Sequence, residues 1–337
     1  MGAPQIARSA VVVGTARLGE GSLIAEGAVI RSFGNGVEVG TGSAVLENSV
    51  VVGNSMIPTA IGRRTTFGHR CTVVGVTVGD LCEIGNASIL MPGARLGDRV
   101  FLGEGTLVPA GMTLPNDVVA VGRPARVIRS VSAEDLARLL VLREGDLSVP
   151  PRTAITLEST QETIVMGQLY EYRGIVPTIA ASAILFPTAE ITGDVVVGER
   201  TIIGAGVKII GDSHGPVRIG NDVQILENTV LHLLPDNDLI IEDGAIVGPG
   251  TMIHGCRIGA GSIVEPGAIV CDGSSLGAGC VVRAGAVVKQ RSRFPAGTDI
   301  DGFPAVEVGR LVKLPATPAW ALQRDDLPVL TPGDPDQ

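Results

Sequence analysis

Aliphatic side chains recur at every sixth position over long stretches of the chain. In the second half the repeat runs through nine consecutive positions: Ile240, Ile246, Met252, Ile258, Val264, Val270, Leu276, Val282 and Val288. In the first half it runs through Val78, Ile84, Leu90, Leu96, Leu102 and Val108, with earlier traces at Val12, Leu18, Ile24 and Ile30. So many matches to one template identify an internal repeat, which takes precedence over local helix and strand propensities.

A six-residue unit with a turn-permissive residue describes one flat face and one corner of a triangular coil. Three units close a rung, and the aliphatic residue of each unit points inward onto the rung below. The pattern resembles the hexapeptide-repeat left-handed β-helix over most of residues 9–128 and 178–312. We therefore predict an all-β fold of two tandem left-handed parallel β-helices, named here the first coil (1–131) and the second coil (167–312).

The repeat stops between the two coils and again near the end of the chain. Residues 132–144 predict a helix with Ser132 as N-cap and acidic residues in its first turn, and a linker follows. Together they form a helix-and-linker segment over 132–166. The tail, 313–337, is rich in proline and aspartate and holds the single tryptophan, Trp320. We expect this tail either to pack on a coil or to stay disordered.

Composition narrows the possible function classes. The net charge of −9 argues against a nucleic-acid partner, because phosphate binding needs a basic face. No apolar run approaches the roughly 18 residues of a membrane span, which argues against a membrane partner. The N-terminus also lacks the layout of a secretory signal. The five cysteines follow no CxxC spacing, which predicts reduced thiols and a cytoplasmic location. Cys71 and Cys256 are expected to be small buried residues.

Several motifs of the second half resemble the gamma-class carbonic anhydrases. They lie at residues 169–177 (LYEYRGIVP), 191–198 (ITGDVVVG), 211–212 (GD), 227–232 (ENTVLH) and 252–256 (MIHGC). The resemblance is closest to the family's relatives encoded with phenylacetate and carnitine metabolism, whose loop is similar to residues 235–244. The first half resembles a diverged copy at residues 30–31, 46–52, 68–69 and 122–129. We interpret the chain as a tandem duplication.

In that family zinc is held by three histidines where two coils meet. One coil supplies two of the ligands and the neighbouring coil supplies the third. Transferred onto this chain, the resemblance assigns His232 and His254 to the first two positions in the second coil. The third position of the second coil is Pro249. The second coil alone therefore lacks one ligand.

The first coil has lost the opposite ligands. It keeps His69 at the third position, whereas Val52 and Val74 stand at the other two. These losses are complementary, so His69 facing His232 and His254 would rebuild one complete three-histidine site. The alternative is that the surviving histidines are relics of a decayed duplicate.

The resemblance also implies polar residues around the metal. The family's Arg-Gly-Asp is split, with Arg31 in the first coil and Asp212 in the second. The family's site glutamine is leucine in both coils, and Gln224, two residues earlier on the same strand face, is the candidate replacement. His214, beside Asp212, is a candidate for substrate contact or proton transfer, with an ordinary loop role as the alternative.

Three neutral imidazoles with an open fourth position are the usual catalytic zinc arrangement, in which the metal lowers the pKa of bound water to about 7. We predict a metalloenzyme of the hydratase or hydrolase type, with about one Zn²⁺ (or Fe²⁺ or Co²⁺) per chain and a small-molecule substrate. Two alternatives stay open. One is a coenzyme A-dependent hexapeptide acyltransferase or thioesterase, and the other is a non-catalytic, degenerate β-helix scaffold.

The resemblance has a consequence for assembly. Because the family's sites form where coils touch side by side, it implies a homo-oligomer. The complementary histidines require contact between a first coil and a second coil. That contact lies either within one chain or between two chains, and the sequence leaves both open.

Overall fold

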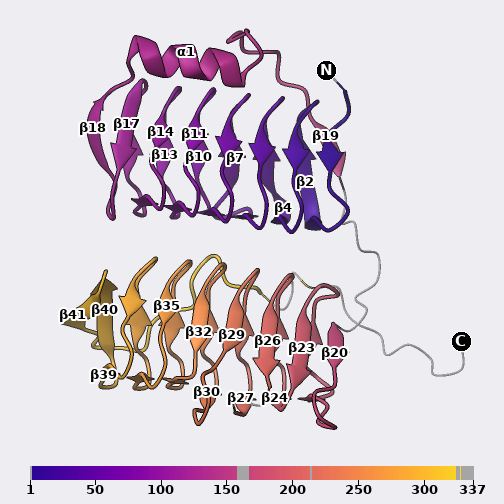
Figure 1. Cartoon of the computed structure of the whole chain (residues 1–337), viewed down its shortest axis with the longest axis vertical. Coiled ribbons are helices and arrows are strands. Elements are labelled where there is room, and N and C mark those ends of the chain that lie inside the picture. The colour runs from indigo at the N-terminus through magenta and orange to yellow at the C-terminus, as the bar shows by residue number, and fades with distance from the viewer. Residues whose placement is uncertain (1, 158–166, 213–214, 324–326, 328–337) are drawn as a thin grey trace, which may run out of the picture.

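The computed structural model describes residues 2–157, 167–212, 215–323 and 327. Two coils of short parallel strands lie side by side and run in the same direction (Figure 1). Helix α1 (Ala133–Leu142) lies on the first coil, on the side away from the second (Figure 1). The prediction of two left-handed parallel β-helices joined by a helix is confirmed. We still propose the division of the chain into a first coil (1–131), a helix-and-linker segment (132–166), a second coil (167–312) and a tail (313–337).

Two hydrogen-bonded sheets make up the first coil. One contains Gln5–Ile6 (β1), Leu23–Ile24 (β3), Ala44–Val45 (β5), Thr66–Phe67 (β8), Glu83–Ile84 (β11), Phe101–Leu102 (β14), Val118–Val121 (β17) and Arg126–Ser130 (β18). The other contains Val11–Leu18 (β2), Val29–Val39 (β4), Val50–Gly53 (β6), Thr59–Ile61 (β7), Thr72–Val74 (β9), Thr77–Val78 (β10), Ile89–Leu90 (β12), Arg95–Leu96 (β13), Leu107–Val108 (β15), Thr113–Leu114 (β16) and Ile155–Leu157 (β19). The long strand β4 turns a corner, so this second sheet covers two faces of the coil.

Three sheets make up the second coil. The first, named here the histidine sheet, contains Gln168–Tyr170 (β20), Glu190–Gly193 (β23), Lys208–Gly211 (β26), Val230–His232 (β29), Met252–His254 (β32), Ile269–Val270 (β35) and Val287–Val288 (β38). The next contains Thr178–Ile179 (β21), Val195–Val197 (β24), Val217–Ile219 (β27), Leu239–Ile241 (β30), Arg257–Ile258 (β33), Ser275–Leu276 (β36) and Arg293–Phe294 (β39). The last contains Ile184–Leu185 (β22), Ile202–Ile203 (β25), Gln224–Ile225 (β28), Ile246–Val247 (β31), Ile263–Val264 (β34), Val281–Val282 (β37), Thr298–Gly302 (β40) and Ala305–Arg310 (β41).

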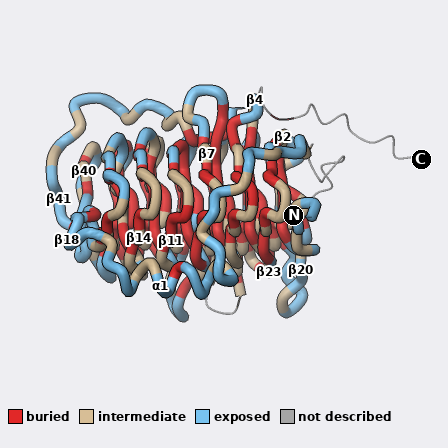
Figure 2. Tube along the Cα trace, turned by 90° about the horizontal axis from the view of Figure 1, so that it is seen from above, coloured by how far each residue is buried: buried red, intermediate tan, exposed pale blue. Residues whose placement is uncertain are grey.

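The inward residues form one continuous apolar stack in each coil. Buried stretches accordingly recur from rung to rung along the chain (Figure 2). The predicted positions from Ile258 to Val288 are inward and buried, as are those of the first coil. The prediction that the three earlier residues of the second coil point inward was wrong for Ile240, Ile246 and Met252. Their following neighbours point inward instead: Ile241, Val247 and Ile253.

A shortened rung explains this error. Ile241 pairs with Ile258, 17 residues later, whereas Ile258 pairs with Leu276, 18 residues later. The first coil is shortened at the corresponding step, where Ile61 pairs with Val78. Because aliphatic residues occupy both adjacent positions before this step, the sequence pattern alone does not distinguish the inward residue from its outward neighbour.

Helix α1 begins as the sequence predicts, and the structure shows how it is anchored. Ser132 caps it in a capping box with Asp135, and Leu139 is buried against the first coil. Past its end, Arg143 donates to the backbone oxygen of Arg64 and pairs with Glu83. No helix in the described ranges is long and apolar enough to cross a membrane. The predicted burial of Cys71 and Cys256 is confirmed.

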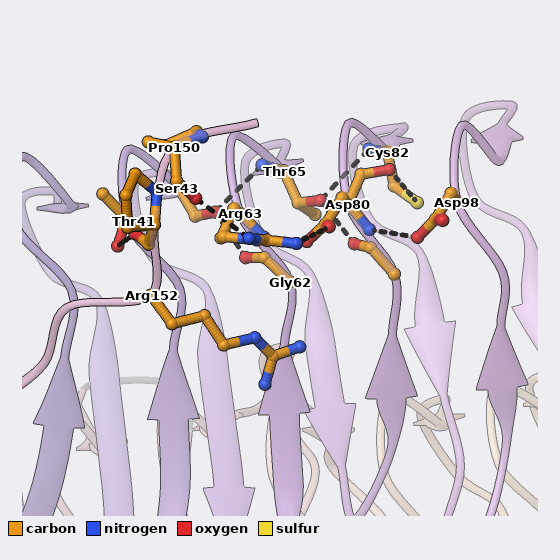
Figure 3. A network of polar contacts seen from close by, with 12 residues as sticks. Thr41, Ser43, Gly62, Arg63, Thr65, Asp80, Cys82, Asp98, Pro150 and Arg152 are labelled. Carbon is orange, nitrogen blue, oxygen red and sulfur yellow. Dashed lines mark hydrogen bonds and ion pairs between the residues drawn. The ribbon is translucent and has the colours of Figure 1, made fainter. Parts of the chain in front are cut away.

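The linker after α1 is held by a polar ladder on a corner of the first coil (Figure 3). Arg63 lies at its centre, donating to Pro150 O at 2.9 Å and forming an ion pair with Asp80 at 2.5 Å. Burial alone would raise the pKa of Asp80, but the hydrogen bonds and charge of Arg63 outweigh it and lower this pKa. The ladder therefore depends on an ionised Asp80.

We expect Asp80→Asn to lower the free energy of unfolding by roughly 1–2 kcal/mol near neutral pH, because it removes the charge from a partly buried ion pair. A carboxylate with a depressed folded pKa stabilises above its unfolded pKa, and that stability is lost as pH falls through the folded pKa. The difference between wild type and variant should therefore persist at neutral pH and vanish in acid. Urea unfolding across pH measures it, with the exposed Asp238→Asn as control. A difference that does not change with pH would contradict the assignment.

The coils pack on each other through a third apolar cluster. The first coil contributes valines of β2, β4, β6 and β9, and the second contributes mainly outward residues of β25, β31, β34 and β37. Trp320, Ala321 and Leu322 of the C-terminal tail complete the cluster. This part of the tail therefore packs between the coils, which is one of the two outcomes expected from the sequence.

Candidate metal site

Two of the predicted ligands lie together on the histidine sheet. His232 ends β29 and His254 ends β32, and the two are register partners on successive rungs. Their ring centroids are 5.2 Å apart and the rings are nearly perpendicular. Both side chains are about one quarter exposed. The parallel register brings together two residues that are far apart in the sequence.

Carboxylates lie beside both rings. Asp212 Oδ2 is 3.6 Å from His232 Nε2, and Asp272 Oδ2 is 3.1 Å from His254 Nδ1. A carboxylate accepts hydrogen bonds, so His254 Nδ1 donates, and Nε2 of the neutral ring keeps the lone pair that a metal needs. Carboxylates commonly orient metal-binding histidines in this way.

Sequence reasoning found Asp212 but missed Asp272. The signal was available, because Asp272 stands 18 residues after His254, which is one full rung. Its other oxygen accepts from Leu234 N and from the Asn237 amide, both at 3.3 Å. Asp272 is therefore a fixed acceptor within the second coil.

His69 lies in the turn between β8 and β9 of the first coil. Its Nδ1 is 2.6 Å from Glu47 Oε2, and its side chain is 52% exposed. This histidine therefore also has a carboxylate neighbour, and Glu47 was a second residue that sequence reasoning missed. Within the described ranges of one chain, however, no group of three or more His, Cys, Asp or Glu could hold a metal. A single copy does not bring His69 to His232 and His254.

The first coil's counterparts of the histidine pair lie at the interface between the coils. Val52 is the third residue of β6 and Val74 is the last residue of β9, and they are register partners just as His232 and His254 are. Both valines are fully buried in the apolar cluster between the coils. At these two positions, where the family resemblance places two metal ligands, the interface within one chain is therefore apolar and buried.

The second coil's counterpart of the His69 turn meets this same interface. The backbone N–H of Gly250 donates to Glu227 O, and the backbone N–H of Arg70 makes the equivalent bond to Glu47 O. Pro249 precedes Gly250 just as His69 precedes Arg70, so Pro249 and His69 occupy equivalent turn positions. A Cβ atom on Gly250 would lie 2.5 Å from Thr72 Oγ1 on β9. The turn of one coil therefore packs closely against the sheet of the other.

Arg31 and Gln224 lie at the interface between the coils, where both hold the C-terminal tail. Arg31 Nε forms an ion pair with Glu227 Oε1 at 2.6 Å, and its Nη2 donates to Trp320 O at 2.6 Å. Gln224 Nε2 donates to Leu322 O, and Leu322 N donates back to its Oε1, both at 2.9 Å. His214, the remaining predicted site residue, lies outside the described residues.

No protein-family model matches the chain. Among curated proteins, it is 43% identical over 104 residues to a carbonic anhydrase of Geobacillus kaustophilus, covering 31% of this chain and 57% of that protein. It is 34% identical over 138 residues to the mitochondrial gamma carbonic anhydrase 1 of Arabidopsis thaliana, covering 39% and 50%. It is 30% identical over 105 residues to the carnitine operon protein CaiE of Escherichia coli K12, covering 31% and 53%. The chain spans about half the length of the curated relatives it matches.

Solved structures with similar coils include a hexapeptide transferase family protein of Anaplasma phagocytophilum. That match has 27% identity and a TM-score of 0.42, and covers 43% of this chain and 86% of that one. A Bacillus cereus protein assigned to the acetyltransferases matches at 34% identity with a TM-score of 0.43, covering 44% and 86%. The chain therefore has the hexapeptide-repeat β-helix fold and, over about a third of its length, is similar to gamma carbonic anhydrases and to CaiE.

Proposed function

We propose that the chain is a metal-dependent hydratase or hydrolase whose site forms between two copies. His232 and His254 would come from one copy, and the partner's His69 would complete the ligand set. The proposal includes a small-molecule substrate, a homo-oligomer and a reduced cytoplasmic setting. One observation carries it: Val52 and Val74 are buried between the coils, whereas their counterparts on the histidine sheet, His232 and His254, stay about one quarter exposed.

The packing of the coils within one chain sets Thr72, at the start of β9, beside the turn that contains Gly250, and buries Val52 and Val74, further along β6 and β9, between the coils. The ends of β29 and β32 are their counterparts in the second coil, and they carry His232 and His254. Repeating the same contact would place the equivalent turn of a second copy beside Met252, at the start of the strand that ends at His254. In a first coil, that turn carries His69. Such a head-to-tail contact is heterologous, so it closes into a ring or continues as a filament.

The donor chemistry fits a metal. His69, His232 and His254 each have a carboxylate within 3.6 Å. A carboxylate on one ring nitrogen directs the other toward a ligand and raises its basicity. A metal held by three imidazoles supplies Lewis acidity and lowers the pKa of a water molecule to about 7. Asp272 would keep the proton on His254 Nδ1, and Asp212 would orient His232.

The direct test is elemental analysis of the purified chain, paired with light scattering and assays of CO₂ hydration and ester hydrolysis. We expect about one zinc, iron or cobalt per chain, an oligomer, and activity that chelation removes and metal restores. An oligomer without metal, but with a groove protected by coenzyme A, would favour acyl transfer. Absence of both metal and coenzyme A binding would favour the scaffold.

A further inference from the structure

A cleft of about 900 Å³ opens between the ends of the two coils, and it shares no lining residue with the histidine pair. Its walls are mainly apolar: Met91, Leu107 and Pro109 from the first coil, Phe303 and Val306 from the second, and Trp320 from the tail. Cavities of this size with few polar groups are typical sites for small molecules. The charged groups in the walls decide which small molecules fit.

Two of the four charged residues in the walls, Glu265 and Arg283, are neutralised within the second coil. Arg283 makes two contacts of 2.7 Å with the Asp299 carboxylate and one of 3.2 Å with Glu265. The other Glu265 oxygen accepts from Ala284 N at 2.9 Å. Burial raises the pKa of Glu265 despite Arg283. In this network the charge of Arg283 is already neutralised by two carboxylates.

Arg123 has no such counter-ion among the residues that the structure describes. It donates through Nη1 to Gly105 O at 3.1 Å and through Nη2 to Gly285 O at 2.7 Å, so it bridges the two coils. Its Cζ lies 5.7 Å from the centre of the Phe303 ring. Desolvation lowers the pKa of its guanidinium, which nevertheless stays charged. A guanidinium has five N–H donors, and two are used here, so three remain for an anion.

We propose that this cleft binds a monocarboxylate with an aliphatic or aromatic body, with the carboxylate on Arg123 and the body against the apolar walls. One guanidinium neutralises one negative charge. Asp301, which also lines the cleft, would repel a dianion such as phosphate. The fixed position of Arg123 between two carbonyls pre-organises it for planar carboxylate recognition. The proposal does not depend on the metal site.

The chain carries its own probe, because its single tryptophan, Trp320, lines the cleft. We would titrate the full chain with octanoate and follow Trp320 fluorescence, using octanamide as the neutral compound of equal length. Octanoate should bind about tenfold more tightly than octanamide, because only the ion makes charge-assisted hydrogen bonds to Arg123. High salt should lower the affinity of the cleft for octanoate and leave its affinity for octanamide unchanged.

Two variants separate anion recognition from loss of fold. Arg123→Gln should remove the preference for octanoate, and Asp301→Asn should increase octanoate affinity by about two- to fivefold through loss of a like charge. Equal affinities for octanoate and octanamide in the wild type would overturn the proposal. So would an unchanged affinity for octanoate in both variants, or no binding of either compound by fluorescence and calorimetry.

Discussion

Alanine at any one of His69, His232 or His254 should reduce bound metal from about one per chain to nearly none. Two imidazoles hold zinc much more weakly than three, so the loss of any ligand should have a similar effect. The result for His69 is the most informative, because this residue lies in the other coil, beside Glu47. Metal content after gel filtration in metal-free buffer measures the effect.

His214→Ala is the matched control, since the proposal gives that residue no ligand role. It should keep full metal content. Retention of metal in His69→Ala would show that the first coil supplies no ligand. The pair on the histidine sheet would then belong to a different site or to none.

Arg31→Met should lower the free energy of unfolding by about 3–5 kcal/mol, because it leaves Glu227 buried without its counter-charge. Arg31 and Glu227 have side chains that are only 1% and 2% exposed. The variant also removes the donor to Trp320 O, which ties the tail to the interface. Urea unfolding, followed by circular dichroism and by Trp320 fluorescence, measures the loss.

The double variant Arg31→Met with Glu227→Met should recover most of this stability, because two apolar residues can replace a buried ion pair at little cost. Arg17→Met is the control, since its pair with Glu38 is partly exposed and should contribute at most about 1 kcal/mol. If Arg31→Met is no more destabilised than Arg17→Met, the buried pair does not hold the coils together.

The repeat was sufficient to predict the fold because each rung is a local structure whose inward residues recur at a fixed spacing. The helix was likewise predictable, since Ser132 and Asp135 form a capping box that is local in sequence. The pattern failed at Ile240, Ile246 and Met252, where the shortened rung changes the phase. A one-residue change in rung length is invisible when both adjacent residues are aliphatic.

The site was only partly predictable for a different reason. His232 and His254 were found through motif resemblance, and the parallel register explains why they meet. The contacts of Arg31 with Trp320 and of Gln224 with Leu322 were missed because both partners lie in the tail, which has no repeat and reaches the interface only in three dimensions. Asp272 was missed because it contacts His254 from the next rung, 18 residues later, and lies outside the motif that contains His254.

The most direct test of a site shared between copies is to mix two defective variants. His69→Ala and His232→Ala would be purified separately, dissociated, combined in equal amounts and reassembled. In a head-to-tail ring with random assembly, about one quarter of the contacts would join an intact histidine pair to an intact His69 of the partner. We therefore predict that metal binding rises from nearly none to about one quarter of the wild-type value. If the mixture binds no more metal than the separate variants, the site is not shared between copies and the account is contradicted.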